Sequence, residues 1–312
     1  MKINRKMDKK RKIIVITGPT ATGKTALAVA VAKKFNGEII SADSRQVYKF
    51  MNLGTGKDLE EYENIPYHMI DIAHPNETFS LYEFLEGAKR AMEEIWARGK
   101  NVVICGGTPL YVNAILQKYE LLRSEVDEEL RERLNSLSLN ELQSLLKELS
   151  PSAFEALNED DRINPLRVRR QIELLQSNSN RMEEEKPLPW ADFEALVLGV
   201  YYPRNVVRER VDIRLKKRFE AGMIDEVKFI HEVENVSYEK LEKFGLEYRE
   251  IAKFLQGEYS YNELYTQLLN KIRQFVKRQD IFFRKMEREG IKINWVNEGN
   301  IEIASKLISE FL

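Results

Sequence analysis

The sequence predicts an α/β protein in which a parallel sheet, flanked by helices, is interrupted by an all-helical insertion. Three observations lead to this fold class. Short apolar runs alternate with helical spacing over residues 13–105, and a glycine-rich loop joins the first run to the first helix. Residues 127–175 are charged and helical, without strand runs. Alternating strands and helices are typical of a parallel sheet with helices on its faces.

The predicted strands are short runs rich in β-branched residues, which indicate buried strands. The helices between them place apolar residues at helical spacing, and Ser80 with Glu83 forms the capping-box pattern that begins one of them. We expect strands over 13–16, 38–41, 101–105 and 195–202, and helices over 26–35, 81–98, 204–221, 224–234, 246–255 and 261–288.

A charged segment without strand runs separates the third predicted strand from the fourth. Its best helices cover 127–149 and 166–175. Residues 176–190 (QSNSNRMEEEKPLPW) are polar and end in prolines, which is typical of a linker. The domains that we predict are a core of residues 12–122 and 195–312 and a helical insertion domain of residues 123–194.

The bulk composition restricts the class of protein and its location. The 312 residues can bury a sizeable core, and 43% of them are hydrophobic. Because the net charge is −1, any contact with nucleic acid must depend on local basic patches. The only cysteine, Cys105, cannot form a disulfide within the chain, and no apolar run reaches the length of a membrane span. We expect a cytoplasmic monomer that does not bind membranes.

Residues 18–25 (GPTATGKT) match the phosphate-binding pattern known as the P-loop, and they stand between a predicted strand and a predicted helix, as the motif requires. Backbone N–H groups of such a loop converge on phosphate oxygens, and the helix N-terminus adds partial positive charge. Lys24 supplies a mobile cation, and Thr25 offers a hydroxyl to Mg²⁺. The predicted diphosphate-binding loop consists of Gly18, Pro19, Thr20, Ala21, Thr22, Gly23, Lys24 and Thr25.

The P-loop alone predicts a bound diphosphate or polyphosphate and leaves the reaction open. Hydrolysis of ATP, phosphoryl transfer and departure of diphosphate would all use the same loop. Asp43 follows the strand predicted over 38–41, at the sheet edge where ligands bind in such folds. A carboxylate at this place can hold a metal ion or act as a base.

Spaced motifs along roughly residues 12–296 resemble those of the tRNA dimethylallyltransferases and follow the same order. After the P-loop, the chain carries ISADSRQVY at 40–48, GTGK at 54–57 and PYHMID at 66–71. Further along it carries GGTPLY at 106–111, NPLRVRR at 164–170, and KRQ at 277–279 followed by Phe283 and Arg284. Several motifs in order are far more specific than a P-loop alone.

The resemblance implies that a dimethylallyl group moves from its diphosphate to N6 of adenosine 37, beside the tRNA anticodon, with the help of Mg²⁺. The P-loop would then hold the diphosphate of the donor rather than ATP. A positioned carboxylate helps a weakly nucleophilic amine by taking its proton, and we assign this role to Asp43. Lys24, Thr25 and a Mg²⁺ ion bound to Thr25 would stabilise the charge on the departing diphosphate. Arg210 and Arg214 match arginines of the family and are expected to contact this diphosphate.

Local basic patches are the candidate surface for tRNA. Arginines cluster at 162–170 and 204–218, and on the last long helix Arg273, Lys277 and Arg284 share one face. Anticodon-loop bases are single-stranded and can be flipped into a pocket, so residues near the P-loop are also candidates. The residues that we expect to contact the tRNA anticodon stem-loop are Asp43, Ser44, Arg45, Gln46, Thr108, Arg131, Arg167, Arg170, Lys277, Arg278, Gln279 and Arg284.

The sequence departs from the pattern of the resembled family at three positions. Glu247 stands where a glycine is usual, Phe282 where a tryptophan is common, and Gly56 where an alanine is usual. These changes leave the P-loop and Asp43 untouched, and they concern the contacts with RNA.

Other functions fit parts of the same pattern. An adenylate isopentenyltransferase would prenylate free nucleotides and would not need the basic helices. A small-molecule kinase of the P-loop class would need ATP and an acceptor hydroxyl. A non-catalytic RNA-binding protein would not need Lys24, Thr25 and Asp43 together.

Overall fold

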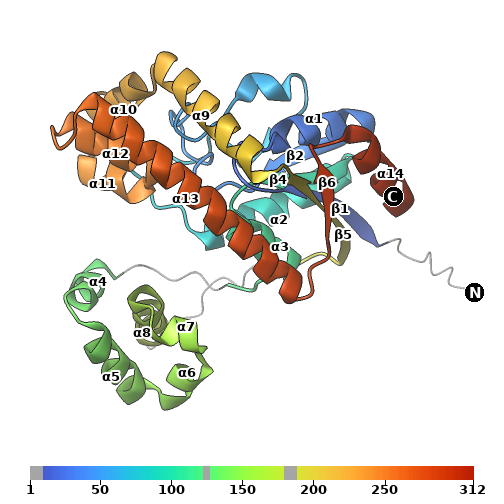
Figure 1. The fold of residues 1–312 in the computed structure, drawn as a ribbon. Coiled ribbons are helices and arrows are strands. Elements are labelled where there is room, and N and C mark those ends of the chain that lie inside the picture. Colours follow the sequence, from blue (N-terminus) through green and yellow to red (C-terminus); the bar gives the residue numbers. More distant parts are fainter. Residues whose placement is uncertain (1–9, 122–126, 179–187) are drawn as a thin grey trace, which may run out of the picture. The chain divides into compact units, whose positions relative to one another are not determined.

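The computed structural model describes residues 10–121, 127–178 and 188–312. The chain divides into two compact units, one made of Met1–Tyr119 with Leu188–Leu312 and the other of Glu120–Pro187. The first unit contains a parallel sheet flanked by helices, and the described part of the second contains helices only, so the predicted fold class is confirmed (Figure 1).

The sheet has six strands in the order β3-β2-β4-β1-β5-β6, and every pairing in it is parallel. Because the strands run in one direction, the ends of β1, β2 and β4 and the loops that follow them lie at one edge of the sheet. The strands are β1 Arg11–Thr17, β2 Gly37–Ser41, β3 Tyr67–His68, β4 Asn101–Gly106, β5 Phe193–Tyr201 and β6 Ile293–Asn297.

Helices cover both faces of the sheet, with α1 and α14 on one face and α2 and α3 on the other (Figure 1). The apolar strand residues pack between these layers, as Ile14 and Ile39 do against Leu27 of α1. The helices of this unit are α1 Lys24–Lys34, the 3₁₀ helix η1 Leu59–Tyr62, α2 Leu81–Ala97, α3 Pro109–Leu116, α9 Arg204–Glu220, α10 Met223–Glu232, α11 Tyr238–Phe244, α12 Leu246–Leu255, α13 Tyr261–Arg288 and α14 Ile301–Phe311.

Helices α9 to α13 form a second layer of the first unit with an apolar core of their own. Val211 of α9, Ile251 of α12 and Leu268 of α13 are buried together in it. The long helix α13 also packs against the sheet layer, because Phe283 is fully buried and contacts the ring of Trp295 on β6 edge to face. Gln279 of α13 binds the backbone of Thr20 and Gly107, which places this helix beside the edge of the sheet where β1 and β4 end.

The core resumes at Leu188, where its backbone is fixed to α2. Leu188 N donates to Glu86 Oε2 at 3.1 Å, and Lys89 Nζ donates to Leu188 O at 2.6 Å. The carboxylate and the ammonium also pair with each other at 2.9 Å, so neither buried charge is isolated. The second unit accordingly covers 120–187, whereas we placed the insertion at 123–194 from sequence.

The second unit is a small helical domain built around Leu134, Leu142, Leu146 and Val168. We predicted one helix over 127–149, and this prediction is wrong. The first helix ends at Asn135. A new helix begins after Ser138, whose side chain forms a capping box with that of Glu141. Residues 179–187 of the predicted linker lie outside the described residues. The helices are α4 Glu128–Asn135, α5 Leu139–Leu149, α6 Pro151–Ala156, α7 Glu159–Arg162 and α8 Pro165–Asn178.

None of the helices in the described ranges has the length and apolar character that crossing a membrane requires.

Candidate active site

A cavity of about 490 Å³ lies at the sheet edge where β1, β2 and β4 end. Its floor comes from the loops that follow these three strands, and its walls come from the loop 54–56 and from helices α9, α12 and α13. Lys24, Thr25, Asp43 and Thr108 all line it, so four residues that the sequence assigned to chemistry or binding meet in one place.

The P-loop follows β1 and turns directly into α1. Gly18 is pressed against β5, and a Cβ atom there would lie 2.7 Å from the carbonyl oxygen of Val200, so this position requires glycine. The loop is braced internally by Thr22 Oγ1, which donates to Pro19 O at 2.8 Å. Gly23 is the N-cap residue of α1, and Thr20 of the loop lines the cavity together with the first two residues of α1.

The ammonium of Lys24, the cation of the P-loop, is buried and has a lowered pKa. Its Nζ donates to Pro19 O at 2.8 Å. Burial lowers the pKa of this ammonium from 10.5 to about 8; the Arg214 guanidinium also lowers it, whereas Asp43 acts in the opposite direction. An additional anion in the cavity would offset the desolvation that disfavours the charged form of Lys24.

Asp43 and Thr108 belong to adjacent loops that are joined by hydrogen bonds. Thr108 N donates to Ala42 O at 3.3 Å, and Ser44 N donates to Thr108 Oγ1 at 3.1 Å. Asp43 Oδ1 accepts the backbone N–H of Arg45 at 2.9 Å, which fixes the carboxylate at the end of β2. The parallel pairing of β2 with β4 therefore brings together residues that are far apart in sequence.

Helix α13 enters the site through Gln279, which is buried at the base of the cavity. Gln279 Oε1 accepts the backbone N–H of Thr20 at 2.9 Å, and its Nε2 donates to Gly107 O at 2.5 Å. This side chain ties the P-loop to the loop after β4. We predicted Gln279 as a tRNA contact; in this structure its amide groups bind the protein backbone, and the contact with tRNA stays a prediction.

Helix α9 presents arginines to the site at intervals of one turn. Arg214 and Arg218 line the cavity. Arg210 binds the P-loop from behind, because its Nε donates to Ala21 O at 2.7 Å and its guanidinium lies 4.7 Å from the centre of the Tyr202 ring. From sequence we placed Arg218 only in the basic patch 204–218 considered for tRNA, although the spacing of the three arginines places them on one helix face.

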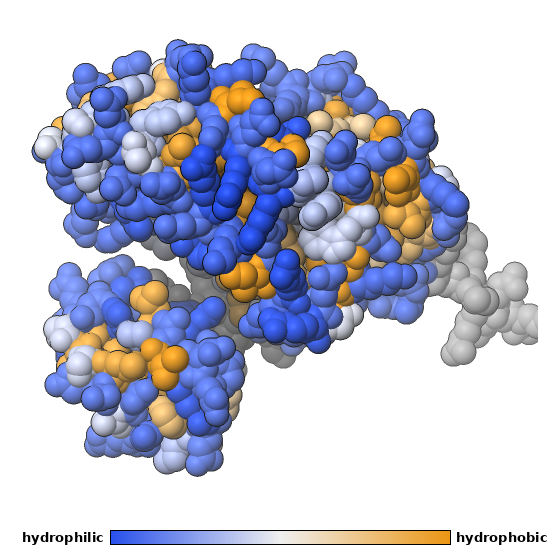
Figure 2. All heavy atoms as spheres, in the orientation of Figure 1, coloured by the Kyte–Doolittle hydropathy of each residue, from blue (hydrophilic) through white to orange (hydrophobic). Residues whose placement is uncertain are grey.

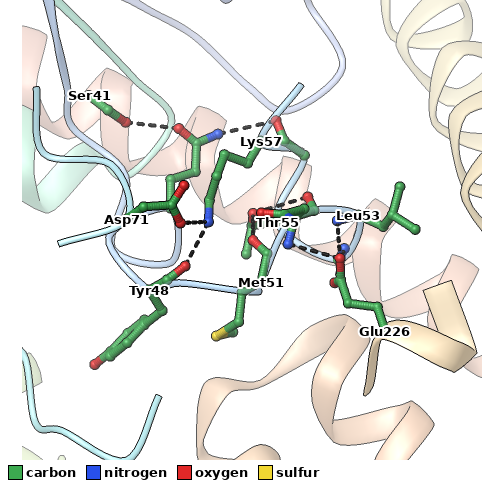
Figure 3. A network of polar contacts seen from close by, with 12 residues as sticks. Ser41, Tyr48, Met51, Leu53, Thr55, Lys57, Asp71 and Glu226 are labelled. Carbon is green, nitrogen blue, oxygen red and sulfur yellow. Dashed lines mark hydrogen bonds and ion pairs between the residues drawn. The ribbon is translucent and has the colours of Figure 1, made fainter. Parts of the chain in front are cut away.

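The loop 51–57 closes one side of the cavity and is held from two directions (Figure 3). The Glu226 carboxylate of α10 accepts the backbone N–H groups of residues 52, 53 and 54 at 2.9, 2.6 and 3.1 Å. From the other side, the buried Lys57 ammonium donates to Tyr48 O at 2.6 Å and pairs with Asp71. This loop is thus fixed, although sequence patterns gave no sign of the Glu226 contacts.

The Gln46 side chain links the same loop to β2. Ser41 Oγ donates to Gln46 Oε1 at 2.8 Å, and Gln46 Nε2 donates to Gly56 O at 3.2 Å. Arg45 lies beside it with its guanidinium 5.5 Å from the centre of the Phe244 ring. Ser44, Arg45 and Gln46 all line the cavity, and their contact with tRNA stays a prediction.

The remaining predicted tRNA contacts lie on helix surfaces. On α13, Lys277, Arg278 and Arg284 are exposed, and Figure 2 shows strongly hydrophilic side chains along this helix. Of these three, Arg278 lines the cavity. In the helical unit, the three predicted arginines are engaged in ion pairs: Arg131 and Arg170 with Glu173 at 3.0 and 3.1 Å, and Arg167 with Asp161 at 3.6 Å.

Two family models match the chain. The model described as IPP transferase matches residues 46–286, and the model described as isopentenyl transferase matches residues 11–65. A curated relative named tRNA dimethylallyltransferase 1, from Geotalea uraniireducens, is 43% identical over 91% of this chain and 92% of its own. Another protein of the same name, from Syntrophus aciditrophicus, is 43% identical over 94% of this chain and 95% of its own.

Solved structures give the same assignment. The tRNA isopentenylpyrophosphate transferase of Bacillus halodurans is 30% identical with a TM-score of 0.68, and the match covers 97% of this chain and 98% of that one. The tRNA delta(2)-isopentenylpyrophosphate transferase of Staphylococcus epidermidis is 29% identical with a TM-score of 0.67, covering 97% and 100%. The resemblance seen in the motifs is therefore confirmed, and the chain belongs to the IPP transferase family.

Proposed function

We propose that this protein transfers a dimethylallyl group from dimethylallyl diphosphate to N6 of adenosine 37 of tRNA, next to the anticodon, and releases diphosphate. One observation carries the proposal: a P-loop cation, Lys24, and a carboxylate outside the P-loop, Asp43, line the same cavity. Relatives named tRNA dimethylallyltransferase support the choice of both substrates.

The proposed reaction is a substitution at the first carbon of the dimethylallyl group. The N6 lone pair forms a bond to this carbon while the bond from the carbon to the diphosphate oxygen breaks, and diphosphate leaves with that electron pair. Asp43 takes the proton that N6 must lose, because an exocyclic adenine amine is a weak nucleophile. Negative charge grows on the leaving group, so Lys24, Arg214 and the P-loop amides stabilise the transition state more than the bound substrate.

Mg²⁺ is the metal ion that suits this site. It usually takes one or two protein oxygens and completes its shell with phosphate oxygens and water. The Thr25 hydroxyl lines the cavity, and no group of three or more His, Cys, Asp or Glu side chains that could hold a metal occurs in the described ranges. Thr25 would hold the ion together with the diphosphate, where its charge would neutralise the leaving group.

The rest of the cavity suits the two organic parts of the substrates. Phe244, Leu246 and Ile272 supply apolar surface for the dimethylallyl chain. Thr108 lies in the loop next to Asp43, where it can position the target base. The exposed basic residues of α13 and of the helical unit are proposed to bind the backbone of the anticodon stem-loop. Action as a monomer in the cytoplasm stays a prediction.

A transfer assay tests the proposed function. The protein is incubated with Mg²⁺ and labelled dimethylallyl diphosphate, and with anticodon stem-loop RNA, with AMP, or with ATP and candidate acceptors. We expect label in the RNA only. The matched control is the same RNA with guanosine at position 37, which lacks the N6 amine and should remain unlabelled. Label in AMP would indicate the adenylate isopentenyltransferase, and loss of phosphate from ATP without prenylation would indicate a kinase.

A further inference from the structure

Arg218 is a buried arginine in the cavity wall that the reaction described above does not use. Only 7% of its surface is exposed, and its Nη2 has no hydrogen-bond partner among the described residues. The nearest carboxylate oxygen, Asp58 Oδ2, lies 3.7 Å from Nη2, which is too far for a hydrogen bond. A buried guanidinium nitrogen that lacks a hydrogen-bond partner is costly, so binding of a ligand that supplies an acceptor oxygen at this place would be favoured.

A second guanidinium stands beside the first. Gly56 has a φ of 68°, and a Cβ atom added there would overlap both Arg214 Nη2 and Arg218 Nη2. Burial lowers the pKa of Arg218 well below its usual range, to about 10, and the charge of Arg214 lowers it as well. Two like charges in partly desolvated surroundings repel each other, and a multivalent anion between them would remove this repulsion.

The pair lies at the phosphate-binding end of the cavity. Thr20 and Ala21 of the P-loop line a small void of about 20 Å³ together with Arg214, Arg218 and Glu247. Arg214 also acts electrostatically on Lys24, the cation of the P-loop. An anion held by the P-loop is therefore within the field of both arginines of α9.

Among the acidic groups around the arginine pair, only Asp58 forms an ion pair with it, and this carboxylate lies beyond hydrogen-bond distance. Asp58 and Glu61 act on it from residues 57–61, and Glu247 acts on it from the start of α12. In the described structure none of them pairs with Arg214 within 4.0 Å, and only Asp58 approaches Arg218 within that limit. Gly56 and Glu247, two of the positions that depart from the family pattern, both border this pair.

We propose that Arg218 binds a phosphate oxygen of the diphosphate, as a third cationic ligand beside Lys24 and Arg214. The inference rests on the proposed function, because it names a further binding residue of the same site. Guanidinium groups form strong charge-assisted hydrogen bonds with phosphate oxygens, and they do so in the fork geometry that a lysine ammonium lacks.

Calorimetric titration with inorganic diphosphate and Mg²⁺ tests the inference without tRNA or prenyl donor. We expect the Arg218→Met variant to bind diphosphate at least about tenfold more weakly than the wild type, because it loses a charge-assisted hydrogen bond. Arg218→Lys keeps the charge and should fall in between. The matched control is Arg90→Met, because Arg90 is an exposed arginine of α2 that does not line the cavity. Its affinity should stay within about twofold of the wild type.

Equal affinities of the wild type and Arg218→Met would overturn the inference while leaving the proposed function intact. A wild type that does not bind diphosphate at all would instead overturn the proposed function. Circular dichroism and thermal unfolding show whether each variant is folded. If Arg218→Met does not fold, Arg218→Lys decides: an affinity equal to that of the wild type together with an unchanged binding enthalpy would count against the hydrogen bond.

Discussion

Asp43 has one carboxylate oxygen engaged by the protein and one available to a substrate. Oδ1 accepts the backbone N–H of Arg45 at 2.9 Å, and no described residue donates to Oδ2. We expect Asp43→Asn to lower kcat by about 10²–10⁴-fold, the range for loss of a general base. Affinities for diphosphate and for the stem-loop RNA should change little, because the amide has the size and shape of the carboxylate. Single-turnover transfer kinetics and binding titrations measure the two effects separately.

The control for Asp43→Asn is Glu61→Gln, which removes a carboxylate that acts on Arg214 and Arg218 but does not line the cavity. This variant should keep its rate within about twofold. Transfer by Asp43→Asn at the rate of the wild type would refute the role of Asp43 as a base.

Lys24 makes the affinity for diphosphate dependent on pH. Burial lowers the pKa of its ammonium to about 8, so the free protein loses this charge as the pH rises through about 8. Bound diphosphate favours the charged form, and the affinity should therefore decrease above pH 8 by up to about tenfold per pH unit. Calorimetric titrations between pH 7 and 9.5 measure this slope.

The matched variant for this pH dependence is Lys24→Met, which should bind diphosphate weakly at every pH and should lack the extra slope. Ionisation of diphosphate itself is common to both proteins, so the difference between their slopes reports on Lys24. Identical slopes would show that another group titrates.

At the level of single residues, motif order located Lys24, Thr25, Asp43 and Thr108, and the structure brings them to one cavity. Arg218 and the Glu226 contacts could not be predicted in the same way. Arg218 becomes significant only because α9 packs next to the loop 54–56, and charged residues on a helix are usually solvated. Such contacts depend on tertiary packing, which local sequence patterns do not encode.

The loop 51–57 is the element whose position depends most on one side chain. The Glu226 carboxylate accepts three successive backbone N–H groups of this loop (Figure 3). It also accepts the hydroxyl of Tyr248 at 2.7 Å. Glu226→Gln replaces one acceptor oxygen with a donor that faces N–H groups. We expect a loss of about 1–3 kcal/mol in unfolding free energy, and faster amide hydrogen exchange at residues 52–54.

The neighbouring Asp225→Asn is the control for this loop, because Asp225 is exposed on the same turn of α10. It should leave both the unfolding free energy and the exchange rates near those of the wild type. Unchanged exchange at residues 52–54 in Glu226→Gln would contradict the view that this carboxylate holds the loop.

At the level of elements, strongly patterned segments were predicted well and short or polar ones were missed. The strands expected over 13–16 and 101–105 are the cores of β1 and β4, because both are buried and β-branched. β6 (INWVN) escaped prediction, since it is an edge strand with mixed burial and little pattern. The break in the predicted helix 127–149 was visible as the capping-box pattern of Ser138 and Glu141, which we did not use.

The whole molecule has a net charge of −1, so its affinity for tRNA must come from where its cations lie rather than from their number. The proposed reaction requires the chain to bind two different anions, the small diphosphate and the tRNA. The cavity for the small anion is lined by Lys24, Arg214 and Arg218. On α13, by contrast, Lys277 and Arg284 are exposed to solvent. The two sets of cations should therefore be separable by measurement.

Lys277→Ala tests the surface set. A lysine that neutralises one phosphate contributes about 0.9 to the slope of log affinity against log salt for duplex nucleic acid, and about 0.7 for single strands. We expect the variant to bind the anticodon stem-loop more weakly at low salt, and the slope of its log affinity against log salt to become less steep by about that contribution. Its affinity for inorganic diphosphate should stay the same.

The control is Lys306→Ala, which removes an equal charge from an exposed position of α14, the helix that packs on α1. A stem-loop affinity of Lys277→Ala that equals that of the wild type at every salt concentration would show that α13 does not contact RNA through this residue. A parallel loss in Lys306→Ala would show that net charge, and not the placement of cations on α13, determines binding.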